Sequence, residues 1–184
     1  MAKIARLKSP VRDLLDFEGG ALYFDEPVDD KVTKLLEAAQ TKTDKQEISL
    51  TLLRAYLLAP DSLLVLVALY RFHYFQHDFE QALVVADQAM AAAGRQLNIP
   101  GNWRDLQPAD IEQAGSHAMT LVRFYLWALK GTGYLLMRLE RFDEAVLPLE
   151  KLRSLDSADR LGGKTLSTLA HEKSLENQKQ RIKS

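Results

Sequence analysis

The chain has 184 residues, of which 47% are hydrophobic and 27% charged, and its formal net charge is −1. These values are typical of one globular domain with a proper core, and the near-neutral charge argues against a nucleic-acid partner, because phosphate binding needs a concentrated excess of Lys and Arg. The sequence has no Cys, which excludes disulfides, thiolate metal sites and cysteine nucleophiles. No apolar run reaches the roughly 18 residues of a membrane span, and the first residues lack the apolar core of a secretory signal. We therefore expect a single-domain cytoplasmic protein with no membrane partner.

Residues 1–28 precede the first regular pattern and are mostly polar. They contain one short amphipathic piece, residues 10–17, which begins with a proline that suits a first helical turn. Two roles are open for this piece: a cap over the first helical unit, or a docking segment for another subunit. We expect the cap, because the end of a helical stack needs a polar cover.

Residues 29–62 and 63–96 each carry two apolar stripes with helical spacing, and Pro60 ends the second helix of the first unit. The stripes of the first unit are Val32, Leu35, Leu36 and Ala39, then Ile48, Leu52 and Ala55. Those of the second unit are Leu66, Leu69, Tyr70 and His73, then Ala82, Ala86 and Ala89. The pattern predicts two consecutive helical hairpins with a period of about 34 residues.

Residues 97–125 form an insertion before the third unit. Residues 98–107 have the turn chemistry of a loop, and Pro108 is expected to open a short helix. From Ser116 to about Leu139 no residue breaks the helical pattern, so the first helix of the third unit is expected to extend as an arm beyond the stack. The arm is too apolar for a solvated helix. Its cover is either the loop itself, through Ile99 and Trp103, or a second protein, as in a dimer.

Residues 126–159 form the third unit, and they repeat a phrase of the second unit. Residues 78–83 read DFEQAL and residues 141–146 read RFDEAV. Phe79 and Phe142 lie 63 residues apart, which is one period plus the insertion. In each phrase the aromatic residue is expected to fill the gap between two antiparallel helices, and the Ala lets their backbones approach. Residues 160–184 are expected to form a C-terminal cap followed by a flexible charged tail from about Glu172.

The phrase, the period and the small residue Gly133 resemble the tetratricopeptide repeat family over a little more than half of the chain. The resemblance is strongest in the third unit, where Gly133, Phe142 and Ala145 stand at the family's small, aromatic and Ala positions. It implies an all-α fold in which antiparallel helix pairs stack as a right-handed superhelix with helical caps; a generic helical bundle is the alternative. Tyr70 stands where the second unit would have a small residue, so its ring is expected to tilt or separate neighbouring helices.

The resemblance also implies a concave groove lined by the first helix of each unit. Its groove-facing residues are Leu64, Val67, Arg71, Tyr74 and Phe75 in the second unit, and Trp127, Lys130, Tyr134, Met137 and Arg138 in the third. Aromatic residues and Arg are the types in which binding energy concentrates, and Arg pairs well with carboxylates. We expect these residues to bind a protein or peptide with an acidic group, although packing against the arm or the insertion is an alternative for each.

Known chemical sites are absent from the sequence. The family members that grip chaperone tails carry Lys and Asn on the first helix, where this chain has Thr33 and Glu37, so that carboxylate clamp is missing. His73 and His77 have the i, i+4 spacing of half a zinc site, but the second half is missing, and a packing role for His73 is favoured. No nucleophile elbow, phosphate loop or dinucleotide motif is present. We expect a non-enzymatic protein without metal or cofactor.

Two functions from different classes remain open. The first is an adaptor or chaperone-like module that holds a partner in its groove. The second is a self-associating structural protein, whose long third-unit helix builds a homodimer and whose groove is closed by its own insertion. Residues 62–72 and 97–103 also resemble uncharacterised bacterial repeat proteins encoded among nitrogen-fixation accessory genes. That resemblance implies a scaffold for a nitrogenase component or assembly factor, with no iron–sulfur cluster of its own because it has no Cys.

Overall fold

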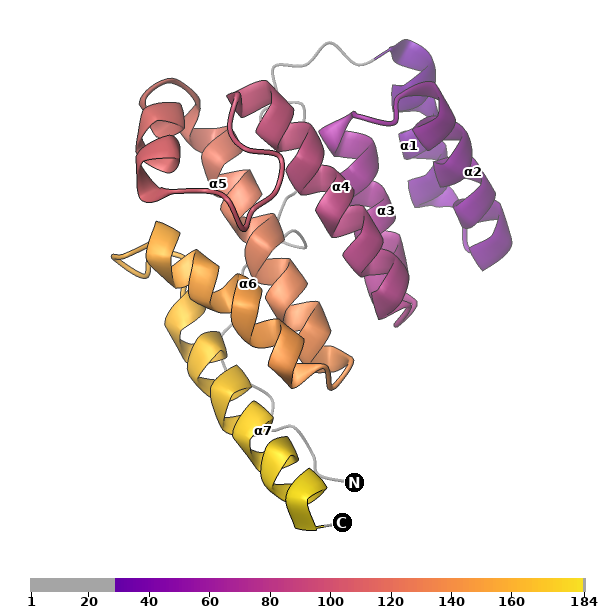
Figure 1. Cartoon of the computed structure of the whole chain (residues 1–184). Helices are drawn as coiled ribbons and strands as arrows, with labels where there is room; N and C mark the ends of the chain where they lie inside the picture. The colour runs from indigo at the N-terminus through magenta and orange to yellow at the C-terminus, as the bar shows by residue number, and fades with distance from the viewer. Residues whose placement is uncertain (1–28, 184) are drawn as a thin grey trace.

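The computed structural model describes residues 29–183, and every regular element in this range is an α-helix. The helices are α1 (Asp30–Thr41), α2 (Lys45–Leu58), α3 (Leu63–Phe75), α4 (Phe79–Leu97), α5 (Pro108–Arg138), α6 (Phe142–Leu155) and α7 (Gly163–Lys183). Figure 1 shows three successive antiparallel pairs, α1 with α2, α3 with α4 and α5 with α6, and then α7 beside α6. The expected all-α fold is confirmed. The amphipathic piece at residues 10–17 lies outside the described residues.

Local chemistry accounts for the helix starts. The carboxylates of Asp29 and Asp44 accept hydrogen bonds from backbone N–H groups in the first turns of α1 and α2, which satisfies donors that a helix start leaves open. Pro108 opens α5, as expected, and the carboxylate of Asp110 accepts the N–H of Gln107 at 2.8 Å. No helix of the described residues is long and apolar enough to span a membrane.

The repeated phrase folds into the same turn twice. His77 and Glu140 have positive φ angles of 59° and 58°, and each lies two residues before the phenylalanine of its phrase. The residue that follows, Asp78 or Arg141, donates its N–H to the carbonyl five residues back at 2.9 Å. This pattern ends the first helix and reverses the chain into the second. The copied sequence therefore encodes a copied helical hairpin.

The buried hydrophobic side chains of the described residues form three clusters. The largest lies between α3, α4 and α5, a second joins α5, α6 and α7, and a third joins α1, α2 and α3. The apolar stripes expected from the sequence supply these clusters: Val32, Ala55, Leu66, Ala86 and Leu149 are all buried. The stacking order of the helices therefore follows the apolar periodicity of the sequence.

Two glycines of α5 permit close contacts that a larger residue would block. A Cβ atom on Gly133 would lie 2.5 Å from Cγ of Leu149, so this small residue lets α6 approach α5. A Cβ atom on Gly131 would lie 3.0 Å from the hydroxyl oxygen of Tyr70, which is fully buried. The ring of Tyr70 thus reaches from α3 across to α5. No Cα atoms of α3 and α5 come within 8 Å of each other, as expected if the bulky ring separates the two helices.

Two features of the C-terminal half are more regular than the sequence indicated. The short helix expected from Pro108 and the long helix expected from Ser116 join as α5 with a bend at Ala118, whose φ of −141° and ψ of 48° are not helical. The first turns of α5 lie at an angle to the long remainder (Figure 1). The tail expected to be flexible from Glu172 continues α7 to Lys183. The hydroxyl of Ser174 donates to Asp143 at 2.5 Å and Arg181 lies 3.6 Å from the same carboxylate, so α7 is held along α6.

Candidate functional site

Aromatic side chains bridge α3 and α5 where the two backbones stay apart. Tyr74 is at the centre: its ring centroid lies 6.2 Å from that of Tyr70, 6.4 Å from that of Tyr134 and 5.9 Å from that of Phe79. These separations fall within the range in which aromatic pairs attract each other beyond simple area burial. We call Tyr70, Tyr74, Phe79, Tyr134 and Arg138 the aromatic cluster.

Arg138 supplies the charge of the aromatic cluster. Its guanidinium carbon lies 4.5 Å from the ring centroid of Phe79, and Nη1 lies 3.4 Å from the hydroxyl oxygen of Tyr134. A guanidinium over a ring face is held by the ring quadrupole, so Arg138 is fixed in orientation while its charge remains. A planar cation fixed in this way is suited to bind a carboxylate.

The ten residues expected in the groove differ in accessibility. Tyr74, Tyr134, Arg71 and Arg138 are half-buried, as are Leu64 and Trp127, and Phe75 is 61% exposed. Val67, Lys130 and Met137 are buried, so they have no surface to offer a partner in this structure.

Lys130 is buried and makes a contact within the chain. Its ammonium group donates to the carbonyl of Leu161 at 2.5 Å and thereby holds the turn between α6 and α7. At the same turn, Gly162 adopts a φ of 67°, a conformation that favours glycine. The position count placed Lys130 in the groove, but it could not show that the turn at Leu161 covers this side chain.

Sequence reasoning missed two members of the aromatic cluster. Phe79 was expected only as a filler between two helices, yet its ring also carries Arg138. Tyr70 was treated as a misfit at a small-residue position, and the structure places its ring against Gly131. A partial signal was present in the sequence, because Gly133 follows Tyr70 by one repeat plus the insertion and Gly131 stands two residues before it, but only the fold shows which glycine faces the ring.

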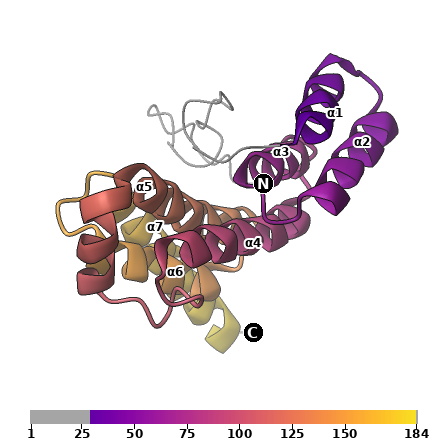
Figure 2. The same ribbon diagram turned by 90° about the horizontal axis from the view of Figure 1, so that it is seen from above.

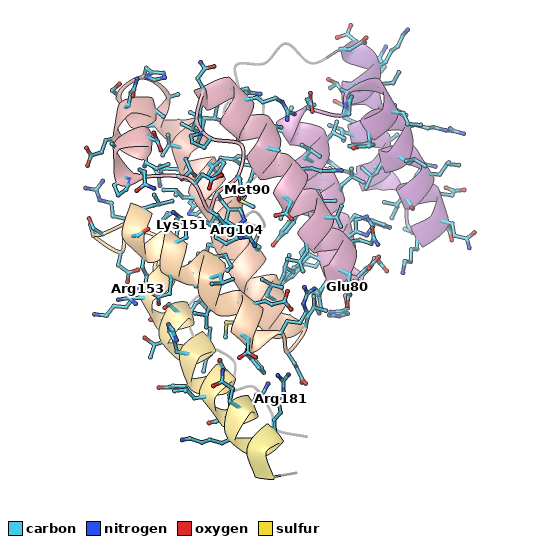
Figure 3. All side chains as sticks on the ribbon, in the orientation of Figure 1. Glu80, Met90, Arg104, Lys151, Arg153 and Arg181 are labelled. Atoms are coloured by element: carbon cyan, nitrogen blue, oxygen red, sulfur yellow. The ribbon has the colours of Figure 1, made fainter. Side chains whose placement is uncertain are left out.

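The insertion loop lies against the second helices of the pairs. Trp103 and Leu106 are buried, and the ammonium group of Lys151 on α6 donates to the carbonyl of Leu106 at 2.8 Å. Arg104 lies 4.1 Å above the ring of Trp103. Figure 3 labels Arg104 and Lys151 where the loop passes α6. Trp103 and Leu106 belong to one core cluster with Phe124 of the arm, so the loop covers the arm, as one of the two sequence alternatives held. The polar contacts of the loop are with α4 and α6 and not with the aromatic cluster.

The hydroxyl of Tyr125, near this loop, has a strongly shifted pKa. Burial raises the pKa of the Tyr125 hydroxyl far above its usual value, and the negative charge of Asp87 acts in the same direction. Desolvation also raises the pKa of Asp87, an effect that the positive charge of Arg104 partly offsets. The hydroxyl of Tyr125 has no hydrogen-bond partner among the described residues. This group sits under the loop and away from the aromatic cluster, so we assign it no role in binding.

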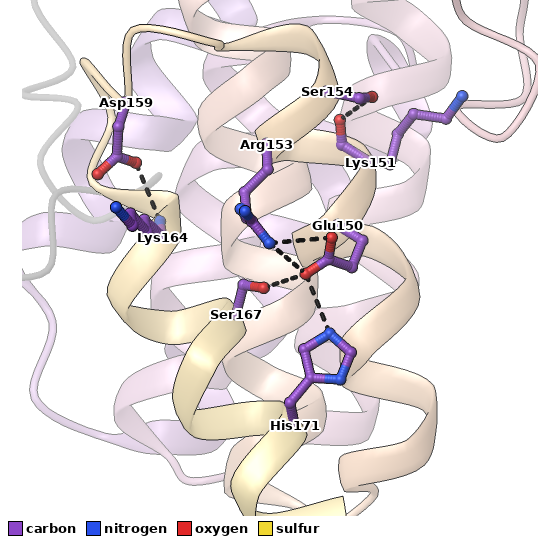
Figure 4. Close-up of polar contacts among 8 residues, drawn as sticks. All are labelled: Glu150, Lys151, Arg153, Ser154, Asp159, Lys164, Ser167 and His171. Carbon is purple, nitrogen blue, oxygen red and sulfur yellow. Dashed lines mark hydrogen bonds and ion pairs between the residues drawn. The ribbon is translucent and has the colours of Figure 1, made fainter.

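A second polar cluster fastens α7 to α6 (Figure 4). One carboxylate oxygen of Glu150 accepts hydrogen bonds from the hydroxyl of Ser167 and from Nη1 of Arg153, and lies 3.0 Å from Nε2 of His171. The hydrogen bond from Ser167 is the main cause that lowers the pKa of Glu150. Ser167 and His171 both bind the carboxylate, and no hydrogen bond between them is present, so the arrangement is a clasp between helices rather than a catalytic triad.

The two histidines with zinc-like spacing have other roles. Nδ1 of His73 lies 3.2 Å from a carboxylate oxygen of Asp78, and His77 occupies the positive-φ position of the turn. Across residues 29–183 no three His, Asp or Glu side chains are grouped in a way that could hold a metal ion. The i, i+4 spacing therefore reflects the turn after α3.

Comparison with known proteins gives one informative relationship. No protein-family model matches the chain, and no solved structure matches it, so the resemblance to the tetratricopeptide repeat family stays a prediction. The chain is 42% identical over 164 residues to the uncharacterized 19.8 kDa protein in the nifW 5′ region of Azotobacter chroococcum mcd 1. The match covers 89% of this chain and 92% of that protein. The expected resemblance to proteins of nitrogen-fixation gene regions is confirmed.

Proposed function

Because this chain belongs to the family of the uncharacterized 19.8 kDa protein in the nifW 5′ region of Azotobacter chroococcum mcd 1, we propose that it serves the nitrogen-fixation system as a non-enzymatic protein-binding module. In this proposal its three helix pairs stack as a right-handed superhelix of the tetratricopeptide type. The twofold occurrence of one turn, at His77 and Glu140, supports this arrangement. The partner is a protein of that system, held as a scaffold or adaptor holds its client.

The accessible part of the aromatic cluster carries the proposal: Tyr74, Tyr134 and Arg138 are half-buried, whereas Tyr70 and Phe79 are buried and hold them in position. Rings fixed by mutual contacts lose little conformational entropy when a partner binds, which is why such residues dominate interface energetics. Arg138 adds a cation whose position is set by Phe79 and Tyr134, and Arg71 lies on the same helix as Tyr70 and Tyr74. The partner should therefore present an acidic side chain next to an apolar one, in an extended or helical segment.

The position of the insertion favours partner binding over a groove closed by the chain itself. The hydrogen bond from Lys151 to Leu106 and the influence of Arg104 on Asp87 place the loop along α6 and α4. These polar contacts are with α4 and α6, whereas the ten expected binding residues lie on α3 and α5. The alternative of a groove filled by Trp103 and Leu106 gains no support from this placement.

Affinity purification of the tagged protein from its native cells, followed by mass spectrometry, tests the proposal. A partner should be recovered with the wild type and lost with the Arg71→Glu/Arg138→Glu variant. The matched control is Arg95→Glu/Arg160→Glu, which reverses the same number of charges at exposed positions outside α3 and α5 and should retain the partner. Direct titration of the purified partner against both variants, with rising salt, then measures the electrostatic contribution.

A more conservative substitution separates charge from packing. Arg138→Lys keeps the positive charge but loses the planar guanidinium over Phe79. If the partner carries a carboxylate, this variant should bind more weakly than the wild type and more tightly than Arg138→Glu. Equal recovery of the partner by all variants would rule out the aromatic cluster as the binding site.

A further inference from the structure

Helix α2 has two apolar faces, and only one of them is used within the chain. Leu52 and Ala55 are buried against α1 and α3. Leu50, Leu53 and Leu57, spaced i, i+3 and i+7, lie on the opposite face and are 49%, 48% and 71% exposed. A helix that is apolar on all sides is normally covered on all sides. The outer face of α2 therefore has the composition of an interface.

No other described helix shows such a cluster. The exposed large hydrophobic residues of residues 29–183 comprise four on α2, the fourth being Leu58, and one on each of α3 to α7. Single exposed apolar residues are normal on a protein surface, whereas a contiguous group marks an interaction site. The described part of the chain offers no cover for this group, because α2 contacts α1 and α3 and no Cα atom of α4 comes within 8 Å of it. Figures 1 and 2 both show α2 at the outer edge of the stack.

The charges beside the leucines indicate which molecule covers them. Glu47 and Arg54 are seven residues apart, so they lie on the same flank of α2 with Leu50 between them. Glu47 already pairs with Lys42 of its own chain at 2.8 Å, but its side chain is 62% exposed and can accept a second cation. If a second α2 helix crosses antiparallel about a two-fold axis between Leu50 and Leu53, Glu47 of each copy lies within one helical turn of Arg54 of the other, a distance that the long arginine side chain can span. The same operation places Leu50 and Leu53 of one copy against Leu53 and Leu50 of the other. The face is thus complementary to itself in both shape and charge, as a two-fold interface requires.

We propose that this chain forms a homodimer through antiparallel pairing of its α2 helices. One helix pair buries less surface than an obligate dimer interface, so the dimer is reversible and depends on concentration. The interface differs from the one expected from the sequence, which placed a dimer on the arm. Phe124 of the arm is fully buried and Trp127 is partly buried within the chain's own core, so the arm has no such surface to share. Two copies joined at α2 would carry two aromatic clusters each available to a partner.

Sedimentation of the full-length protein over a dilution series tests the proposal. The wild type should pass from dimer to monomer on dilution, and Leu53→Glu should be monomeric throughout. Leu147→Glu is the matched control, since Leu147 on α6 is similarly exposed at 55%, and it should dimerise like the wild type. Circular dichroism checks that each variant keeps its helices. A monomeric wild type, a dimeric Leu53→Glu or a monomeric Leu147→Glu would each overturn the proposal.

A charge exchange tests the antiparallel register itself. Arg54→Glu places two like charges together twice, and should raise the dissociation constant about tenfold. Glu47→Arg should do the same. The double variant Glu47→Arg/Arg54→Glu restores both pairs across the two-fold axis and should recover dimerisation. A double variant that stays monomeric would overturn the antiparallel arrangement. A monomeric wild type that binds a different protein through the α2 leucines would overturn the homodimer itself.

Discussion

The contact between Gly133 and Leu149 lets us work out from the structure whether replacing Gly133 by Ala stabilises or destabilises the protein. Gly133→Ala should gain about 1 kcal/mol from helix propensity. Against this, the new Cβ would lie 2.5 Å from Cγ and 2.6 Å from Cδ2 of Leu149, and Leu149 is fully buried. Overpacking of a well-filled core costs about 1–3 kcal/mol. Because Cγ is attached close to the backbone of α6, the helices must move apart, and we expect a net loss of about 1–2 kcal/mol.

Gly115 provides the matched control for this prediction. A Cβ atom on Gly115 would lie 3.0 Å from Cε of Met119, which is the free end of a flexible side chain that is 52% exposed. The methionine can rotate away, so Gly115→Ala should stabilise the protein by about 0.5–1 kcal/mol. Urea unfolding followed by circular dichroism measures both variants. Both variants replace Gly by Ala, but their effects on the unfolding free energy should have opposite signs.

A double-mutant cycle gives the decisive result. Leu149→Ala alone should cost about 2–5 kcal/mol, and it removes each of the three Leu149 atoms that the new Cβ would meet. In this background Gly133→Ala should become stabilising, and the coupling energy between the two sites should reach about 2 kcal/mol. If Gly133→Ala stabilises the wild type as much as it stabilises the Leu149→Ala variant, the close contact between α5 and α6 is refuted.

Three further predictions follow from the polar contacts. The pKa of Glu150 is lowered, chiefly by the hydroxyl of Ser167 and then by Arg153 and His171, so its contribution to stability is present above the unfolded value of 4.5 and is lost as the pH falls through the folded value. The difference in unfolding free energy between the wild type and Glu150→Gln should therefore shrink on acidification below 4.5 in a pH series of urea unfolding; a constant difference would contradict the clasp. Lys151→Met removes the hydrogen bond to Leu106 and should lower the unfolding free energy by about 1–2 kcal/mol. Residues 98–107 should then be cleaved faster by a protease, and an unchanged cleavage rate would show that Lys151 does not hold the loop. Arg138→Gln loses the stacking on Phe79 and should lower the unfolding free energy, measured by urea unfolding, by about 0.5–1 kcal/mol. Arg123→Gln is the control: the guanidinium of Arg123 lies farther from its ring, 5.6 Å from that of Trp127, so a smaller loss is expected.

The sequence predicted the local parts of the fold well because they depend on residues near one another in the chain. Apolar spacing of three and four residues places side chains on one helix face wherever the helix lies. The phrase with Phe79 and Phe142 predicts a turn, and the turn recurs with matching positive φ angles at His77 and Glu140. Pro108 and the polar residues before it likewise predicted the end of the loop and the start of α5.

The candidate site was predicted only in part, because its members come from different helices. The groove positions found Tyr74, Tyr134 and Arg138, which the structure brings together. They also included Lys130, which the structure uses to hold the turn at Leu161. Position counting names the face of a helix, but it does not say whether another segment of the chain lies on that face.

The sequence by itself determined that this chain is a series of helical hairpins with an insertion before the third, since periodicity, prolines and the copied phrase are local properties. Only the tertiary structure decided how the hairpins meet. Tyr70 reaches Gly131 across a gap between α3 and α5, and the bend at Ala118 sets the first turns of α5 at an angle to the rest of the helix. Helix α7 is held along α6 by the hydrogen bond from Ser174 to Asp143, which lie 31 residues apart in sequence. Such contacts join residues whose separation in the chain carries no pattern, and they depend on volumes and charges that match only after the helices have packed.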